Sequence, residues 1–180
     1  IVLRSEDYLD IPPTEVIDVP VVLPSKGTTI YKKLVKELLV NIKDRKVKAV
    51  NSGVLVGKLQ QIVGGAVYST SGKLEDIMRG DEETKPLEIH GAKVEALKKL
   101  HDANGNQPML VGTMFTHERE RIVRDIPGAE LFDSTKLDRW NRGEISMLVA
   151  DPRSMAHGLN MQSGGCHITW FTLPYHLEQM

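Results

Sequence analysis

Apolar residues recur along the chain in two different rhythms, and each rhythm predicts one kind of element. Helical spacing predicts amphipathic helices at residues 30–42, from 51 or 52 to 63, 93–103, 116–123 and 134–143. Short apolar runs predict buried strands at residues 109–115, 145–150 and 166–171, and a short strand at 129–133. Residues 16–23 are also rich in β-forming side chains, but Pro20 favours a position at the edge of a sheet.

The order of these elements predicts the fold class. From residue 108 onward, continuous apolar strands alternate with helices, which is typical of a mainly parallel sheet covered on both faces. We therefore expect a three-layer αβα domain of the α/β class. Residues 1–29 are expected to form a lead-in segment with an edge strand, residues 30–180 the domain itself, and the polar residues 69–88 a loop.

Composition and charge exclude few classes of function. The 180 residues are 41% hydrophobic, which is enough to form one core. The formal net charge of −1 gives no indication of nucleic-acid binding. Residues 26–48 nevertheless hold eight basic side chains against two acids, which would suit a polyanion or, as the sequence alone favours, a solvated helix face. Cys166 is the only cysteine, so no intrachain disulfide is possible, and neither a signal-peptide pattern nor an apolar run of membrane-spanning length is present.

Several catalytic motifs fail when they are tested against the chain. The glycine spacing before Lys73 does not match a phosphate-binding loop, and no buried strand precedes the acidic run 81–84. Arg121 stands where the second histidine of a zinc motif beginning at His117 would be needed, and no nucleophile elbow occurs. The chain carries no complete catalytic set of its own, so we expect neither a metal site nor ATP hydrolysis by this chain alone.

Polar side chains do gather after the predicted strands. The carboxyl ends of parallel strands meet at one edge of a sheet, where ligands usually bind, and the loops 115–117, 151–162 and 172–176 should meet there. They are rich in hydrogen-bond donors, which suits a phosphodiester backbone better than a metal ion. The alternative is that these side chains only cap helices and turns. The residues concerned are Thr116, His117, Arg119, Arg153, Ser154, His157, Asn160, Gln162 and His176.

Two stretches resemble a known family. "PMLVGTMFTHERERI" at 108–122 resembles the fourth motif of Swi/Snf-like superfamily 2 helicases, and "RWNRGEISMLVADPRSMAHGLN" with the residues up to 180 resembles the run through the fifth motif. Residues 56–68 and 90–100 resemble two helices of the same family. The chain thus resembles the second, C-terminal RecA-like lobe of such a helicase, in the compact form found in phages and prophages.

The resemblance implies a role and its partners. In such motors ATP and Mg²⁺ lie between two RecA-like lobes, and the second lobe contacts the DNA backbone and supplies one wall of the ATP cleft. It implies DNA contacts from Thr116, His117, Arg153, Ser154 and His157, and a nucleotide-cleft role for Gly158, Leu159 and Asn160. The implied partners are duplex DNA, bound without sequence preference, and the N-terminal lobe of the same protein, in the cytoplasm of a bacterium or a phage-infected cell. The chain alone would bind no cofactor.

The chain also departs from the family pattern. Asp151 stands where many relatives carry histidine. A carboxylate repels phosphate, although the positive charge of Arg153 would offset that repulsion. The sixth motif is missing before Met180 and no initiator methionine is present, so we expect a piece of a longer ATPase that is inactive by itself. Two other classes stay open: a non-catalytic nucleic-acid or protein interaction module, and a small α/β enzyme. As a DNA anchor, the 26–48 stretch is expected to matter less than Arg153.

Overall fold

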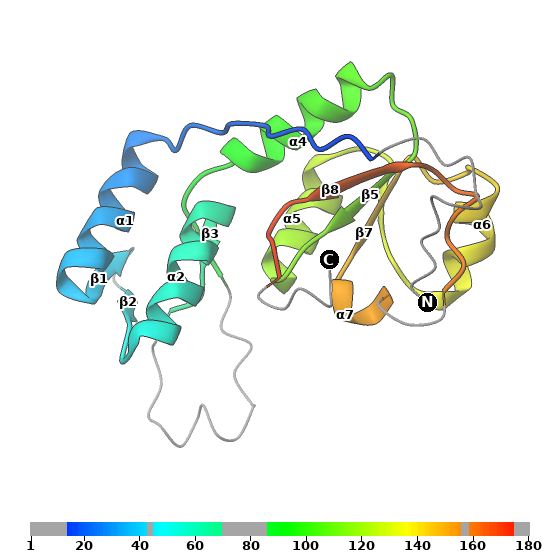
Figure 1. The fold of residues 1–180 in the computed structure, drawn as a ribbon. Helices are drawn as coiled ribbons and strands as arrows, with labels where there is room; N and C mark the ends of the chain where they lie inside the picture. Colours follow the sequence, from blue (N-terminus) through cyan, green and yellow to red (C-terminus); the bar gives the residue numbers. More distant parts are fainter. Residues whose placement is uncertain (1–13, 43–44, 70–85, 156–158, 175–180) are drawn as a thin grey trace, which may run out of the picture.

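The computed structural model describes residues 14–42, 45–69, 86–155 and 159–174, and a four-stranded parallel sheet forms its larger half (Figure 1). Its strands are β5 (Met109–Gly112), β6 (Ala129–Leu131), β7 (Met147–Ala150) and β8 (His167–Trp170), in the order β6-β7-β5-β8. Leu110 lies opposite both Leu148 and Ile168, so the strand ends are level across the sheet. The expected parallel sheet is confirmed.

Helices cover both faces of this sheet because alternate side chains of each strand point to opposite sides. Helices α4 (Ala92–Ala103) and α5 (Thr116–Asp125) pack on the face that carries Val111 and Val149. The other face carries Leu148, which packs against Trp140 of the short helix α6 (Leu137–Asn141). The predicted three-layer α/β architecture is therefore confirmed, and it is consistent with a RecA-like domain.

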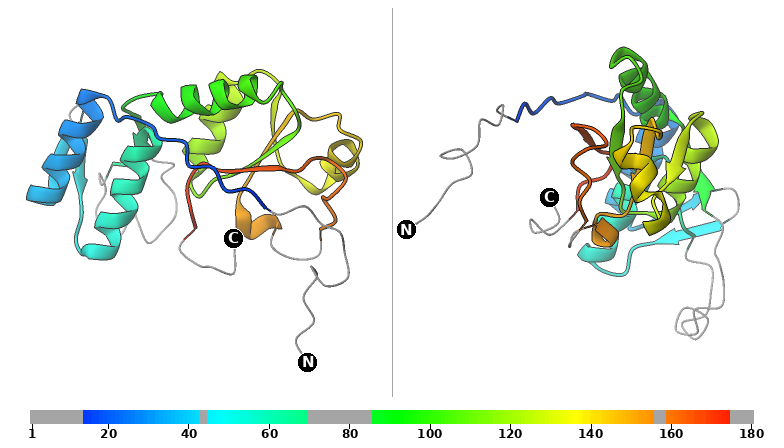
Figure 2. Two further views of the ribbon diagram at one scale, coloured as in Figure 1. Left: turned by 45° about the horizontal axis from the view of Figure 1, so that its top comes forward. Right: turned by 90° about the vertical axis from the view of Figure 1, so that its right-hand side faces the viewer.

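A second, smaller core lies at the other end of the molecule, where α1 (Ser25–Glu37) and α2 (Ser52–Gly64) lie side by side (Figure 2). Two antiparallel pairs complete it: β1 (Leu39–Ile42) with β2 (Arg45–Lys48), and β3 (Ala66–Val67) with β4 (Leu87–Glu88). Its buried apolar side chains form a cluster separate from the sheet cores. The cluster contains Ile30, Leu34, Val40, Ile42, Val47, Ile62, Val67, Leu87 and Ile89.

The hairpin β1–β2 corrects the expected helix over residues 30–42. The helix begins earlier, at Ser25, and ends at Glu37, after which Leu38 adopts a left-handed φ of 54°. Val40 and Ile42 are then buried at every second position, the spacing of a strand, and Val40 faces Val47 across the pair. Leu38, Leu39 and Ile42 fit both a helical and a strand pattern, so apolar spacing alone did not separate the two.

The second predicted helix is confirmed as α2. Asn51 caps it, since its side chain accepts a hydrogen bond from the backbone N–H of Val54 at 2.9 Å. Gly65 ends it with a φ of 100°, a conformation that side chains with a Cβ rarely adopt. The helix predicted at 93–103 is confirmed as α4, one residue longer at its start.

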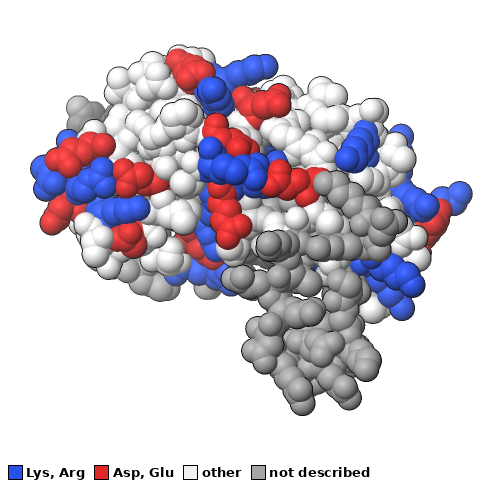
Figure 3. Space-filling view, turned by 180° about the vertical axis from the view of Figure 1, so that it is seen from behind, with Lys and Arg blue, Asp and Glu red and all other residues white. Residues whose placement is uncertain are grey.

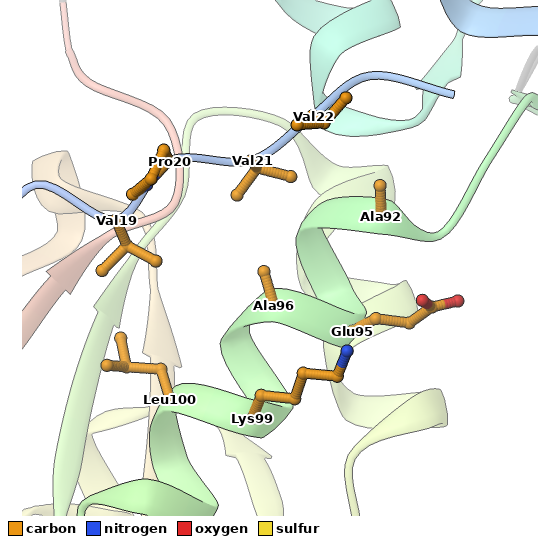
Figure 4. Close-up of a pocket in the computed structure, with 9 residues that line it drawn as sticks. All are labelled: Val19, Pro20, Val21, Val22, Ala92, Glu95, Ala96, Lys99 and Leu100. Atoms are coloured by element: carbon orange, nitrogen blue, oxygen red, sulfur yellow. The ribbon is translucent and has the colours of Figure 1, made fainter. Parts of the chain in front are cut away.

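The segment before α1 contradicts the expected edge strand. Residues 14–24 form no regular element and run in extended form past α4, where Val19, Val21 and Val22 lie over Ala92 and Ala96 (Figure 4). A hollow of about 430 Å³ lies between them. The expected boundary between residues 29 and 30 falls inside α1. None of the helices in the described ranges is long and apolar enough to cross a membrane.

Candidate nucleic-acid interface

Three strand ends meet at one edge of the sheet, as the sequence predicted. Thr113, which follows β5, donates its backbone N–H to the carbonyl of Ala150 at 2.9 Å, and Phe171, which follows β8, donates to the carbonyl of Gly112 at 2.9 Å. A Cβ on Gly112 would lie 2.6 Å from the Trp170 ring, so only glycine fits there. The loops after β5, β7 and β8 are thereby fixed beside one another.

A cluster of polar side chains lies on this edge, and we call it the Asp151 cluster. The Asp151 carboxylate accepts hydrogen bonds from Arg119 at 3.3 Å and from Arg153 at 3.0 and 2.6 Å. Arg119 also donates to the Thr116 hydroxyl at 3.1 Å, and the Ser154 hydroxyl donates to the Asp151 carbonyl at 2.7 Å. The structure therefore brings together the predicted residues Thr116, Arg153 and Ser154, from the start of α5 and from the short helix α7 (Pro152–Met155).

The charges of this cluster leave a small positive excess. Two guanidinium groups surround one carboxylate, and the hydrogen bonds from Arg153 are the main cause that lowers the pKa of Asp151 below its usual range. Arg153 is 62% exposed, whereas Arg119 is 21% exposed. A guanidinium has five N–H donors, so each arginine can bind Asp151 and a phosphate at once. The cluster can receive an anion, although Asp151 competes with it.

His117 corrects the expectation of an exposed histidine beside Thr116. Its side chain has no exposed surface: it stacks on Phe115 with ring centres 5.6 Å apart and meets Tyr68 edge-on at 5.3 Å. Burial, with the Arg121 charge second, lowers the pKa of His117 to about 4. Thr116 begins α5 at the surface, and the next residue is turned inward by the helical rotation. The prediction that the His117 side chain contacts DNA is therefore wrong for this structure, because the side chain is buried.

Two charged residues of α5, Glu118 and Arg121, are buried. Glu118 accepts the Thr172 hydroxyl at 2.6 Å and the backbone N–H groups of Met114 and Phe115 at 3.3 Å each, and burial raises its pKa. Arg121 donates to the carbonyl oxygens of Gly64 at 2.8 Å and His90 at 2.5 Å.

These contacts tie α5 to the loop after β8 and to the smaller core. The sequence interpretation missed them. Glu118 and Arg121 share a helix face with the buried Ile122, and that spacing was the available signal.

The remaining predicted residues lie elsewhere or outside the described part of the chain. The carbonyl of Asn160 accepts a hydrogen bond from Asn141 of α6 at 2.9 Å, and that of Met161 accepts one from Trp140 at 2.9 Å. Leu159 is half-buried in the same segment. These bonds tie the segment to α6. His157, Gly158 and His176 lie outside the described residues.

Comparisons with known proteins were made against family models, curated proteins and solved structures. No family model matches the chain. A protein called p41 from Acyrthosiphon pisum secondary endosymbiont phage 1 is 34% identical over 181 residues, covering 98% of this chain and 36% of the phage protein, so the chain spans about a third of that relative. The crystal structure of the Pyrococcus furiosus Hef helicase domain aligns with 83% of this chain and 39% of its own, at 16% identity and a TM-score of 0.40.

Proposed function

We propose that this chain is the C-terminal motor lobe of an ATP-dependent DNA helicase or translocase of the Swi/Snf-like type, encoded by a phage or prophage. The observation that carries the proposal is the Asp151 cluster. Its donors stand at the carboxyl edge of a parallel sheet, on the two loops whose sequences resemble the fourth and fifth helicase motifs. Similarity to a phage protein supports the phage context.

The chemistry of the cluster supports backbone binding without sequence preference. Hydroxyl and guanidinium donors are the groups that contact phosphate oxygens, and such contacts position a protein on DNA without reading bases. The Thr116 hydroxyl accepts from Arg119 and keeps its own hydrogen for a phosphate, while Arg119 and Arg153 supply the charge. The Ser154 hydroxyl would first release the Asp151 carbonyl to which it donates. In this proposal the N-terminal lobe brings the phosphate-binding loop and the Mg²⁺ ligands. Gly158, Leu159 and Asn160 keep their proposed place beside the nucleotide.

Removing both arginines of the cluster tests the proposal. In the full-length protein that carries this chain, Arg119→Ala with Arg153→Ala is expected to raise the DNA concentration for half-maximal stimulation of ATP hydrolysis about tenfold, because two charge-assisted phosphate contacts are lost. ATP hydrolysis measured across a DNA titration checks this. Arg139→Ala with Arg142→Ala is the control, since it removes two exposed arginines on and just after α6 that pair with acids. Equal effects in both double variants would refute the proposal.

Asp151 itself gives a test of opposite sign. Asp151→Asn is expected to tighten duplex DNA binding by the chain about fivefold, since two charges ~4 Å apart in water repel by roughly 1 kcal/mol. Fluorescence anisotropy with a labelled duplex measures this, and Asp138→Asn on α6 is the control that removes the same charge elsewhere. Weaker binding by the Asp151 variant would mean that the carboxylate mainly holds the two arginines in place.

A further inference from the structure

Positive charge is concentrated in the smaller half of the molecule. Helices α1 and α2 with strands β1 and β2 carry eight basic residues and a single acid, Glu37, whereas residues 86–174 carry ten basic and eleven acidic residues. Figure 3 shows the difference, with red and blue side by side over the sheet half and blue predominating at the end formed by α1. Over the sheet half, many acidic and basic side chains lie together because they form ion pairs, for example those of Arg124, Arg139 and Arg142.

The lysines of α1 share one side of the helix. Gly27, Ile30 and Leu34 are buried and define the inner side. At 100° per residue, the four lysines fall within an arc of roughly 120° on one side of the helix, and Lys32 and Lys36, one turn apart, point most directly away from the buried side. Lys33 pairs with Glu37 at 3.9 Å, and both side chains are about half exposed, so this pair neutralises little of the face. The four lysines are Lys26, Lys32, Lys33 and Lys36.

The hairpin next to α1 carries two further exposed lysines. In β2 the exposed Lys46 and Lys48 flank the buried Val47, so both point to the outer side of the hairpin. Lys46 lies opposite Asn41 of β1. Between the start of α1 and β1 the surface is hollowed by about 440 Å³. That hollow is lined by Ser25, Lys26, Thr29, Ile30, Asn41 and Ile42.

We propose that this surface binds the phosphodiester backbone of duplex DNA as a second contact, separate from the Asp151 cluster. We call it the lysine face, made of Lys26, Lys32, Lys33, Lys36, Lys46 and Lys48. That the polyanion is DNA rests on the proposed function. The structure supplies the positive charge, the side that the α1 lysines share, and the hollow beside Lys26.

The lysine face is expected to contribute more to DNA binding than the Asp151 cluster does, whereas the sequence led us to expect that Arg153 would matter more. Both arginines of the Asp151 cluster are engaged by a carboxylate, so a phosphate must share them with Asp151. Of the six cations of the lysine face, Lys33 pairs with Glu37, the one acid of its elements, and Lys48 also has a partner, so Lys26, Lys32, Lys36 and Lys46 carry the comparison. Since affinity for DNA grows with the number of phosphates neutralised, the lysine face should supply the larger share.

The salt dependence of DNA binding tests this inference. For the chain with a short labelled duplex, we expect the plot of log affinity against log salt to have a slope steeper than about −4, whereas the Asp151 cluster alone would give about −2 to −3. Lys32→Glu with Lys36→Glu is expected to weaken binding at least about tenfold and return the slope to that shallower range. Lys98→Glu with Lys99→Glu is the matched control, with the same charge change on exposed lysines of α4.

Each outcome decides the inference. If both double-lysine variants lost the same DNA affinity, net charge alone would explain the effect and the inference would be overturned. Failure of the wild-type chain to bind the duplex at low salt would also overturn it. If the chain bound poly-glutamate as tightly as DNA, and this binding also required Lys32 and Lys36, the lysine face would be assigned to an acidic protein instead of DNA. The proposed function is judged separately, by ATP hydrolysis in the arginine variants, so either proposal can fail while the other stands.

Discussion

Arg121→Ala is expected to destabilise the protein by about 3 kcal/mol, because it leaves buried carbonyl groups without their donor. The Arg121 side chain is only 4% exposed and donates to Gly64 and His90, which belong to the smaller core and its connection to α4. Its removal should therefore weaken the attachment between the two halves of the molecule. Urea denaturation followed by circular dichroism measures the change in the free energy of unfolding.

Arg124→Ala is the matched control for that experiment. Arg124 lies one turn further along α5, is 54% exposed and pairs with Glu88 and Asp125 at the surface. Exposed ion pairs of this kind contribute less than about 1 kcal/mol. A loss of stability in the Arg121 variant no larger than in the Arg124 variant would show that α5 does not hold the two halves together.

The parallel sheet could be predicted because its central strands, β5 and β7, are apolar on both faces. Leu148 and Val149 point to opposite cores, so β7 appears in the sequence as one unbroken apolar run, the mark of a strand covered on both sides. The hairpin β1–β2 could not be predicted in the same way. Its apolar residues continue directly from α1, and the strand spacing becomes visible only once Val40 and Val47 are known to pair.

The candidate site was predictable only at its surface. Thr116, Arg153 and Ser154 follow strands directly, so the order of elements was enough to bring them together. The burial of His117 depends on Tyr68, a residue 49 positions away along the chain. Local spacing does not contain such a contact.

The buried His117 gives the protein a stability that depends on pH. Burial lowers its pKa to about 4 in the folded protein, whereas the pKa of a histidine in an unfolded chain is ~6.5. Below that unfolded value the unfolded chain takes up a proton that the folded protein resists, so stability falls as pH falls from 6.5 toward 4. At pH ~4.5 the loss from this residue should be about 2.5 kcal/mol. Glu118, whose pKa is raised, acts in the opposite direction as it gains its proton.

His117→Phe isolates this contribution, because it keeps a ring against Phe115 and Tyr68 and removes the titrating group. The two ring nitrogens of His117 have no hydrogen-bond partner in the described structure, so the variant should be at least as stable as the wild type near neutral pH. Urea denaturation of both proteins between neutral pH and pH ~4.5 should show the wild type losing about 2.5 kcal/mol more than the variant. His90, whose pKa burial also lowers, and Glu118 are present in both proteins and cancel in the difference. Parallel pH profiles would mean that His117 takes up its proton in the folded state, and hence that the ring reaches solvent, where a DNA backbone could meet it after all.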